Sequence, residues 1–456
     1  MKFSHLMLAV ALLGTGVSAQ ADTQRLAGAS ASLVNVTKAL KQLCGAGTFK
    51  AYKTTSSTSS LGNIVTATCS TPFVDAVDQV RINVNGGSLS AVLNRGGNTG
   101  AVTAKFIDPT AATCTALGAG TGALSFALNG ELQNCTTTGQ LDEFSQGGYL
   151  DVEGGIFGAT GQTLPPEVDI TTDFPAASFQ QVFGVGVSTS LYKALQEYQT
   201  IKAQLPANCT TVAGLVHTAT GSTTPECQPN VSKAAFTSFV AAGNNTAKKA
   251  GANFLFGGSA VVANDLTAGG ATMATAAPLG TDFVYCRRPA TSGTQASAQV
   301  YFLHNPTATG DLGGALAVAG QAVSGQSLIG ANYIAKTNSG TSDVRTCLNG
   351  ATDFAAGVLS MENNPIGTDS YRFLKINGQS GSGGVAGDSQ TAEAIAGRYD
   401  FVFESVKYCP AGVCVSVLDA IDTALLPGAS TAGLFLAAEA KFSRGGKATA
   451  PYIARP

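Results

Sequence analysis

Residues 282–303 read DFVYCRRPATSGTQASAQVYFL. The apolar run at the start predicts a strand, and the residues from Gln295 to the end predict a helix. Between them, Arg288 precedes Ser292-Gly293-Thr294. A helix N-terminus has unpaired N–H donors and a partial positive charge, and glycine lets a ligand come close to the backbone. This stretch therefore predicts a strand–turn–helix unit whose turn can bind an oxyanion.

Two other junctions repeat this design. Gly28-Ala29-Ser30 and Gly86-Gly87-Ser88 each follow an expected strand and precede an expected helix. Any one of the three junctions, taken alone, is better explained by ordinary helix capping. Three in one chain favour an anion site, and Arg288 adds to this because a guanidinium can bind a tetrahedral oxyanion through two parallel hydrogen bonds.

Strands and helices alternate along the chain, which predicts α/β layers. Further strands are expected at Phe179–Val187 and Gly357–Met361. The Thr-, Gly- and Ala-rich stretch 100–146 is expected to be an irregular insertion, and 431–442 a helix. With 456 residues the chain is too long for one simple core, so two or three structural units are expected.

Composition narrows the class of function. Hydrophobic residues make up 44% of the chain, which argues against global disorder. Charged residues make up 12%, about half of the usual ~25%. Lys and Arg number 26 against 28 Asp and Glu, so no basic excess is present for wrapping nucleic acid.

The first 21 residues resemble a secretory signal peptide. Lys2 precedes the apolar run Leu6–Val17, and Ala19-Gln20-Ala21 fits a small-x-small cleavage pattern, so Asp22 is the expected mature N-terminus. The run is too short to span a bilayer, and no later stretch reaches ~18 uninterrupted apolar residues. A buried N-terminal helix is the alternative. Export to the periplasm or the exterior is expected.

Ten cysteines follow the signal segment, and an even number in an exported chain predicts disulfides. Pairing of neighbours in sequence, which leaves two cysteines for a fifth bridge, gives Cys44–Cys69, Cys114–Cys135, Cys209–Cys227, Cys409–Cys414 and Cys286–Cys347. Sequence does not prove this connectivity. The cysteines lack zinc-ligand spacing, so neither a metal nor a cofactor is expected.

The segment Arg288-x-x-x-Ser292-Gly293-Thr294 resembles the R-x-D-G-S-G-T segment of the periplasmic phosphate-binding proteins of ABC importers. Other segments are similar to that family in the same order, namely Leu26–Ser30, Asn85–Ser88, Gly147–Asp151, Val182–Val187 and Gly357–Glu362. The resemblance covers about half of the mature chain in patches. It implies a type II periplasmic binding protein: two α/β lobes joined by two crossing strands, here with disulfide-bearing insertions.

The resemblance also implies lobe boundaries and ligand contacts. Lobe 1 would comprise 22–180 and 361–456, and lobe 2 would comprise 181–360. The implied ligand-binding residues are Ser30, Ala31 through its backbone N–H, Ser88, Asp151, Arg288, Ser292, Gly293 and Thr294. Asp151 would accept a hydrogen bond from a protonated phosphate oxygen and so reject sulfate.

The chain departs from the family pattern at three positions. Ala290 stands where the family has the Asp that orients the arginine, Leu150 replaces a Ser, and Thr291 replaces a Gly. Another acid or a carbonyl must then hold Arg288. Arg287 is expected on the opposite side of the strand, in a surface or structural role.

The function implied is capture of an oxyanion, phosphate first, by a monomer that delivers it to an ABC permease. Two alternatives stay open: a secreted or surface protein that uses the fold for protein contacts, and a binder of a different oxyanion. Catalysis is not expected, because nucleophile-elbow and P-loop motifs are missing and the mature chain has only His217 and His304 as histidines. A Ser–His pair formed in space remains an alternative.

Overall fold

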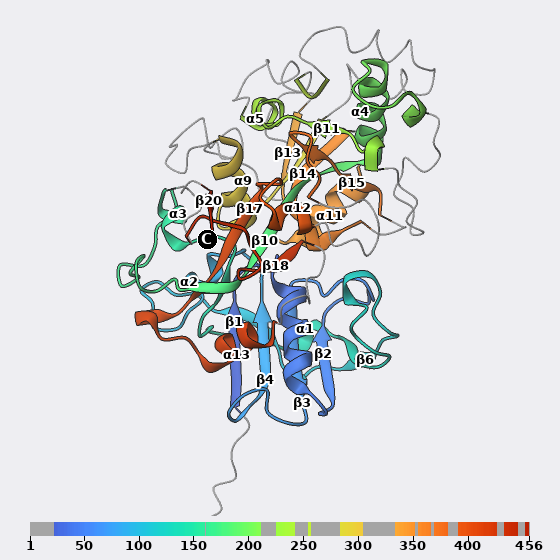
Figure 1. Ribbon diagram of the computed structural model, residues 1–456. Coiled ribbons are helices and arrows are strands. Elements are labelled where there is room, and N and C mark those ends of the chain that lie inside the picture. Colours follow the sequence, from blue (N-terminus) through green and yellow to red (C-terminus); the bar gives the residue numbers. More distant parts are fainter. Residues whose placement is uncertain are drawn as a thin grey trace, which may run out of the picture.

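The computed structural model describes residues 22–159, 161–210, 225–241, 254–256, 283–303, 333–351, 354–365, 369–381, 391–425, 433–445 and 452–455 (Figure 1). The expected signal segment, His217 and His304 lie outside these residues. The chain is a mixed α/β protein with two lobes and two main sheets, the second of which extends from one lobe into the other, and this confirms the predicted fold class. Within the described residues, we find no helix long and apolar enough to cross a membrane.

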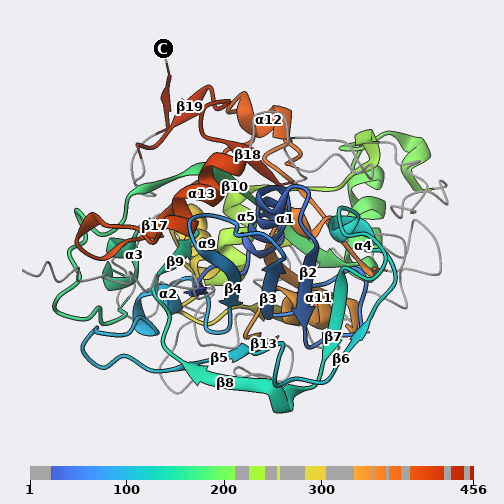
Figure 2. The same cartoon turned by 90° about the horizontal axis from the view of Figure 1, so that it is seen from below.

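The first lobe contains a six-stranded sheet in the order β1-β4-β3-β2-β7-β6. Its strands are β1 (Asp22–Ala27), β2 (Phe49–Lys53), β3 (Ile64–Cys69), β4 (Val77–Asn83), β6 (Cys114–Ala116) and β7 (Leu132–Cys135). Helices α1 (Leu33–Cys44) and α13 (Ser416–Ala424) pack together on one face. The ribbon of β5 (Ala104–Ile107) and β8 (Gln140–Glu143) covers the other face (Figure 2).

The second main sheet has the order β13-β12-β14-β10-β17-β9, and two further strands pair with β10. Its strands are β9 (Gly148–Leu150), β10 (Ala176–Ser188), β12 (Phe283–Arg287), β13 (Tyr333–Thr337), β14 (Phe354–Ser360), β15 (Tyr371–Phe373), β17 (Val402–Tyr408) and β18 (Leu434–Leu436). The remaining strands form small pairs, β11 (Asn230–Val231) with β16 (Lys375–Ile376) and β19 (Phe442–Ser443) with β20 (Ile453–Ala454). The other helices are α2 (Ser90–Leu93), α3 (Gly154–Ala159), α4 (Thr189–Ile201), α5 (Lys233–Ala241), α9 (Gly293–Leu303), α11 (Thr341–Asn349) and α12 (Thr391–Ile395).

Strand β10 carries the chain from the first lobe to the second. Its first half pairs with β17 and β18, and its second half pairs antiparallel with β14, with Phe183 opposite Ser360. The C-terminal part of the chain then returns, because β17 pairs with β9 and α13 packs on α1. This connectivity is the one expected of two lobes joined by crossing strands. The boundaries expected near residues 180 and 360 stay a prediction.

Two large hydrophobic cores support the lobes. One lies under α1 and α13, and the other lies between β10, β12, β14 and the helices of the second lobe. Three first-lobe residues, Ala31 and Leu89 in turns and Leu150 at the end of β9, belong to the second core. Each is next in sequence to an expected polar site residue. Burial of these apolar side chains therefore places the polar residues of the first lobe close to the second lobe.

Two expectations for local structure are wrong. Residues 100–146 contain strands β5 to β8, and β7 joins the main sheet beside β2. Instead of a helix, 431–442 contains β18, which pairs with β10, and the start of β19. Leu434, Phe435 and Leu436 are all buried, so tertiary pairing outweighs the helix propensity of this Ala- and Leu-rich segment.

All five expected disulfides are present. Cys44 and Cys69 join the end of α1 to the end of β3, and Cys286 ties β12 to Cys347 in α11. Cys114 and Cys135 face each other across the β6–β7 pair. By closing loops, these links lower the conformational entropy of the unfolded chain and so stabilise the folded state.

Backbone contacts between β1 and the segment at β9 connect the two sheets. The Ala27 N–H donates to the Gly147 carbonyl at 2.9 Å, and the Ala29 N–H donates to the Tyr149 carbonyl at 2.7 Å. A Cβ atom on Gly148 would lie 1.6 Å from the Ala27 carbonyl oxygen. This position therefore requires glycine.

We predict that Gly148→Ala lowers the free energy of unfolding by about 2–3 kcal/mol, because the backbone of β1 has to move away. Urea unfolding measures the loss. Gly118→Ala is the matched control, since a Cβ there meets nothing within 4 Å, and it should change stability by less than about 0.5 kcal/mol. Equal stability of the two variants would contradict the proposed close contact.

Candidate functional site

The site predicted from the sequence forms where turns from both lobes meet. Ser30 follows β1, Ser88 precedes α2 and Asp151 follows β9, all from the first lobe. Arg288 follows β12, and Gly293 opens α9, from the second lobe. Hydrogen bonds between the two groups, described below, bring these residues together.

Arg288 is buried, with 2% of its surface exposed. Its Nη1 donates to Ser30 Oγ at 2.8 Å and to Thr341 Oγ1 at 3.0 Å, and its Nη2 donates to the Ser339 carbonyl at 2.9 Å. Burial lowers the pKa of the guanidinium to about 10, against the opposing influence of Asp151 and Asp343. Arg288 is therefore still a cation at neutral pH.

One of the three guanidinium nitrogens differs from the other two. Arg288 Nε is buried and has no hydrogen-bond partner among the described residues. A buried N–H without an acceptor costs about 1–3 kcal/mol, and more on a charged group. A further hydrogen-bond acceptor beside Arg288 would therefore stabilise the buried guanidinium.

Asp151 is the negative counterpart, with 2% of its surface exposed. Thr294 Oγ1 donates to Asp151 Oδ2 at 3.3 Å. Burial raises the pKa of Asp151 to about 6, while the charge of Arg288 and hydrogen bonds from Ser88 and Thr294 oppose the rise. The carboxyl group is mostly ionised at pH 7 and takes up a proton within reach of mildly acidic conditions.

Ser88 links the two lobes directly. Its Oγ accepts the Asp151 N–H at 3.2 Å and the Gly293 N–H at 3.1 Å, and its hydroxyl also bonds to the Asp151 carboxylate. A Cβ on Gly293 would lie 2.3 Å from Ser88 Oγ. Glycine at this helix start is thus needed for close approach.

The neighbouring residues pack just as closely. A Cβ on Gly87 would lie 2.5 Å from Ser292 Cα, and the Leu89 N–H donates to the Thr291 carbonyl at 3.0 Å. The Gly86-Gly87-Ser88 turn and the Thr291–Thr294 turn therefore form one continuous interface between the lobes.

The structure brings six of the eight predicted residues into two hydrogen-bonded groups, Ser30 with Arg288, and Ser88 with Asp151, Gly293 and Thr294. The charges of Asp151 and Arg288 link the two groups. The other two, Ala31 and Ser292, are buried beside them, Ala31 in the second core and Ser292 against Gly87. Ligand binding by these residues stays a prediction.

The turn Ser339-Gly340-Thr341 at the start of α11 was not predicted from the sequence to be part of the site. It supplies a carbonyl and a hydroxyl that hold Arg288, where Ala290 offers no carboxylate. The signal was present, because Ser-Gly-Thr here repeats Ser292-Gly293-Thr294 and follows β13, the parallel neighbour of β12.

A second missed residue is Glu362, which lies in the short 3-10 helix Met361–Asn363 after β14. It is 6% exposed and accepts a hydrogen bond from Asn35 Nδ2 at 3.2 Å. Burial raises the pKa of Glu362 well above its usual range, and the negative charge of Asp151 adds to the rise. The site therefore contains two interacting acids.

Arg287 is buried, so its expected surface alternative is wrong. Its Nε donates to the Arg288 carbonyl at 3.0 Å, which fits the structural alternative. Among the residues that the structure describes, we find no group of three or more metal-ligating side chains.

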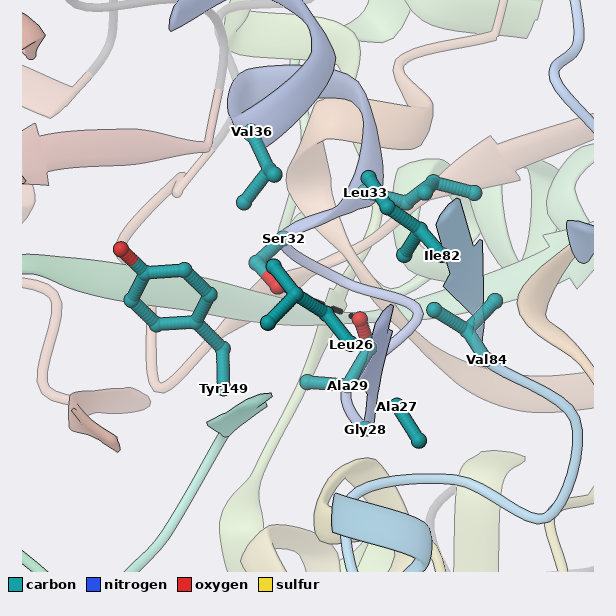
Figure 3. A pocket seen from close by; sticks show the side chains of 10 residues that line it. All are labelled: Leu26, Ala27, Gly28, Ala29, Ser32, Leu33, Val36, Ile82, Val84 and Tyr149. Atoms are coloured by element: carbon teal, nitrogen blue, oxygen red, sulfur yellow. Dashed lines mark hydrogen bonds between the residues drawn. The ribbon is translucent and has the colours of Figure 1, made fainter. Parts of the chain in front are cut away.

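A small apolar pocket of about 10 Å³ lies behind the first turn (Figure 3). Leu26, Leu33, Val36 and Tyr149 contribute to its lining, and the Ser32 hydroxyl donates to the Ala29 carbonyl at 3.1 Å. Its size holds about one water molecule. The lining of the pocket is mostly apolar and therefore unsuited to an anion.

The chain matches no protein-family model and no curated protein sequence. One solved structure covers 91% of this chain and 99% of its own, at 8% identity and a TM-score of 0.38. That structure is described as a phosphate ABC transporter substrate-binding protein from Clostridium perfringens with bound phosphate. A likeness at this level says nothing about which ligand this chain binds.

The raised pKa of Asp151 predicts a pH effect on stability. Its folded pKa, about 6, lies above its ordinary value of 3.8, so the folded state binds the proton more tightly. Its contribution to stability therefore falls as pH rises from about 4 to about 6. Relative to the parent protein, Asp151→Asn should gain roughly 2–3 kcal/mol between pH 4 and pH 7, measured by urea unfolding.

Asp142→Asn serves as the control, because the Asp142 side chain is 55% exposed. It should leave the pH dependence of unfolding unchanged. A parallel pH dependence of the parent and Asp151→Asn would show that Asp151 titrates normally and is not buried beside Arg288.

Proposed function

We propose that this protein is an exported solute-binding protein that captures a tetrahedral oxyanion, phosphate first, between its two lobes for uptake by an ABC-type permease. One observation carries the proposal: a buried, charged guanidinium has an unpartnered Nε among the described residues and is surrounded by hydroxyl groups from both lobes. An oxyanion supplies the acceptor and the negative charge that such a group needs.

The donors around Arg288 suit a tetrahedral anion. The Ser30, Ser88 and Thr294 hydroxyls can rotate toward an oxyanion, and the backbone N–H groups of Ala31 and Gly293 lie in the same turns. Helix α9 adds the partial positive charge of its N-terminus, where Ser292 is also placed. The anion would replace hydrogen bonds that these hydroxyls make with Thr341, Gly293 and Asp151.

Asp151 supports selection among oxyanions. An ionised carboxylate accepts a hydrogen bond from a protonated phosphate oxygen but repels a fully deprotonated anion such as sulfate. Phosphate should therefore bind more tightly than sulfate at neutral pH.

The five disulfides fit an oxidising compartment, so we place the protein in the periplasm or outside the cell. We propose that it acts as a monomer and as a binder, without catalysis, metal or cofactor. The permease would bind the protein with its two lobes in the closed arrangement.

Calorimetric titration with inorganic phosphate tests the site. Arg288→Ala should weaken binding at least about tenfold, since a hydrogen bond to a charged group contributes ~1.5–3 kcal/mol. Arg288→Lys should recover only part of the loss, because an ammonium lacks the planar fork. Arg398→Ala, at a side chain 60% exposed, is the control and should change affinity little.

Circular dichroism should first establish that each variant folds. If the folded parent protein binds neither phosphate nor any other oxyanion, the transport proposal fails and a role in protein contacts takes its place. If Arg288→Ala binds like the parent, the ligand lies elsewhere.

The preference for phosphate over sulfate should depend on pH. Above the Asp151 pKa of about 6 the carboxylate repels sulfate, and below it the protonated group can donate to sulfate. Titrations at pH 5 and pH 8 should therefore give a smaller preference at pH 5. A preference that is equal at both pH values, or equal in Asp151→Asn, would remove Asp151 from the site.

A further inference from the structure

A polar cavity of about 460 Å³ opens between the lobes beside the candidate site. Its walls come from the loop between β2 and β3 in the first lobe and from α11 in the second. Residues on these walls include Thr55, Ser59, Asn63, Ser342, Thr346 and Asn349. These six side chains are at least partly exposed, so the cavity is reached from solvent.

The cavity borders the turns that form the site. Asn85, in its wall, directly precedes Gly86-Gly87-Ser88. Ser342, also in its wall, directly follows Thr341, whose hydroxyl accepts a hydrogen bond from Arg288. Asn63 connects the two walls, because its Oδ1 accepts from Ser342 Oγ at 3.2 Å. The cavity is therefore lined by sequence neighbours of two turns of the site, while Arg288 itself is not among its lining residues.

The lining is neutral and rich in hydroxyl and amide groups. Its two charged residues each have a partner of their own: Arg345 Nη2 lies 3.1 Å from an Asp369 oxygen, and Asp343 accepts the Gly340 N–H at 2.8 Å. Hydroxyls and amides both donate and accept hydrogen bonds, which suits a neutral polar group better than a second anion.

One wall is held in shape from behind. Lys53 is fully buried, and its ammonium donates to the carbonyls of Thr55 and Ser57. These bonds fix the loop that faces the cavity. A wall ordered in advance loses less entropy when a ligand binds.

We propose that the ligand is an oxyanion ester: a phosphoryl group at Arg288 that carries a neutral, hydroxyl- or amide-bearing organic group in this cavity. This inference rests on the proposed function and narrows its substrate class. In such an ester three phosphoryl oxygens would remain for the donors around Arg288. The ester oxygen would lead toward the cavity between Ser30 and Thr341, whose hydroxyls lie 2.7 Å apart and would have to separate. Size supports it, since 460 Å³ lies within the usual ~300–1,000 Å³ of small-molecule sites.

Calorimetric titration with sn-glycerol 3-phosphate and glucose 6-phosphate, compared with inorganic phosphate, tests the inference. At least one ester should bind about tenfold more tightly than inorganic phosphate. Thr346→Trp should remove this advantage and leave the affinity for inorganic phosphate unchanged, because Thr346 is exposed at the cavity rim and its indole would fill the space.

Thr423→Trp is the matched control. Like Thr346, Thr423 is exposed on a helix and its hydroxyl donates to the carbonyl four residues earlier, but it is not part of the cavity lining. It should keep the advantage of the ester. Inorganic phosphate binding as tightly as both esters, or an ester advantage that survives Thr346→Trp, would overturn the inference alone. Absence of binding by phosphate and by both esters would overturn the proposed function with it.

Discussion

Two opposite charges, the Arg288 guanidinium and the Asp151 carboxylate, are buried where the lobes meet. Taking ions out of water costs several kcal/mol each, so such groups persist only when charge and hydrogen bonds compensate. Here Ser30, Ser88 and Thr294 provide that compensation from both sides of the interface. These hydrogen bonds connect the polar turns of the first lobe to those of the second.

Apolar packing makes the close arrangement possible. Three apolar side chains of the first lobe are buried in the core of the second lobe, and each is one residue away from a polar site residue. They are Ala31, Leu89 and Leu150. Glycines at 87 and 293 remove the side chains that would otherwise hold the turns apart. Hydrophobic burial thus supplies the stability, and the polar groups supply the chemistry. In a chain with few charges, the charged residues that are buried are the informative ones.

The α/β class, the strand at Phe179–Val187, the disulfide pairing and the convergence of Ser30, Ser88, Asp151 and Arg288 could be predicted from the sequence, because each left a local pattern. The strands of 100–146 could not, since short polar strands are stabilised by partners distant in sequence. Glu362 was missed for a related reason, because its electrostatic interaction with Asp151 depends on a proximity that only the fold creates. Thr341 did leave a local pattern, a second Ser-Gly-Thr turn, but its bond to Arg288 is known only from the fold.

In the proposed function, the Nε–H of buried Arg288, which has no hydrogen-bond partner among the described residues, is the donor for an oxyanion. NMR of protein labelled with ¹⁵N-arginine observes this group directly, and Arg288→Lys identifies its signal. On addition of inorganic phosphate or a phosphate ester, we expect a downfield shift of the Arg288 Nε–H proton, while the exposed Arg398 signal stays in place. An Arg288 signal that does not respond to a saturating oxyanion would contradict the claim.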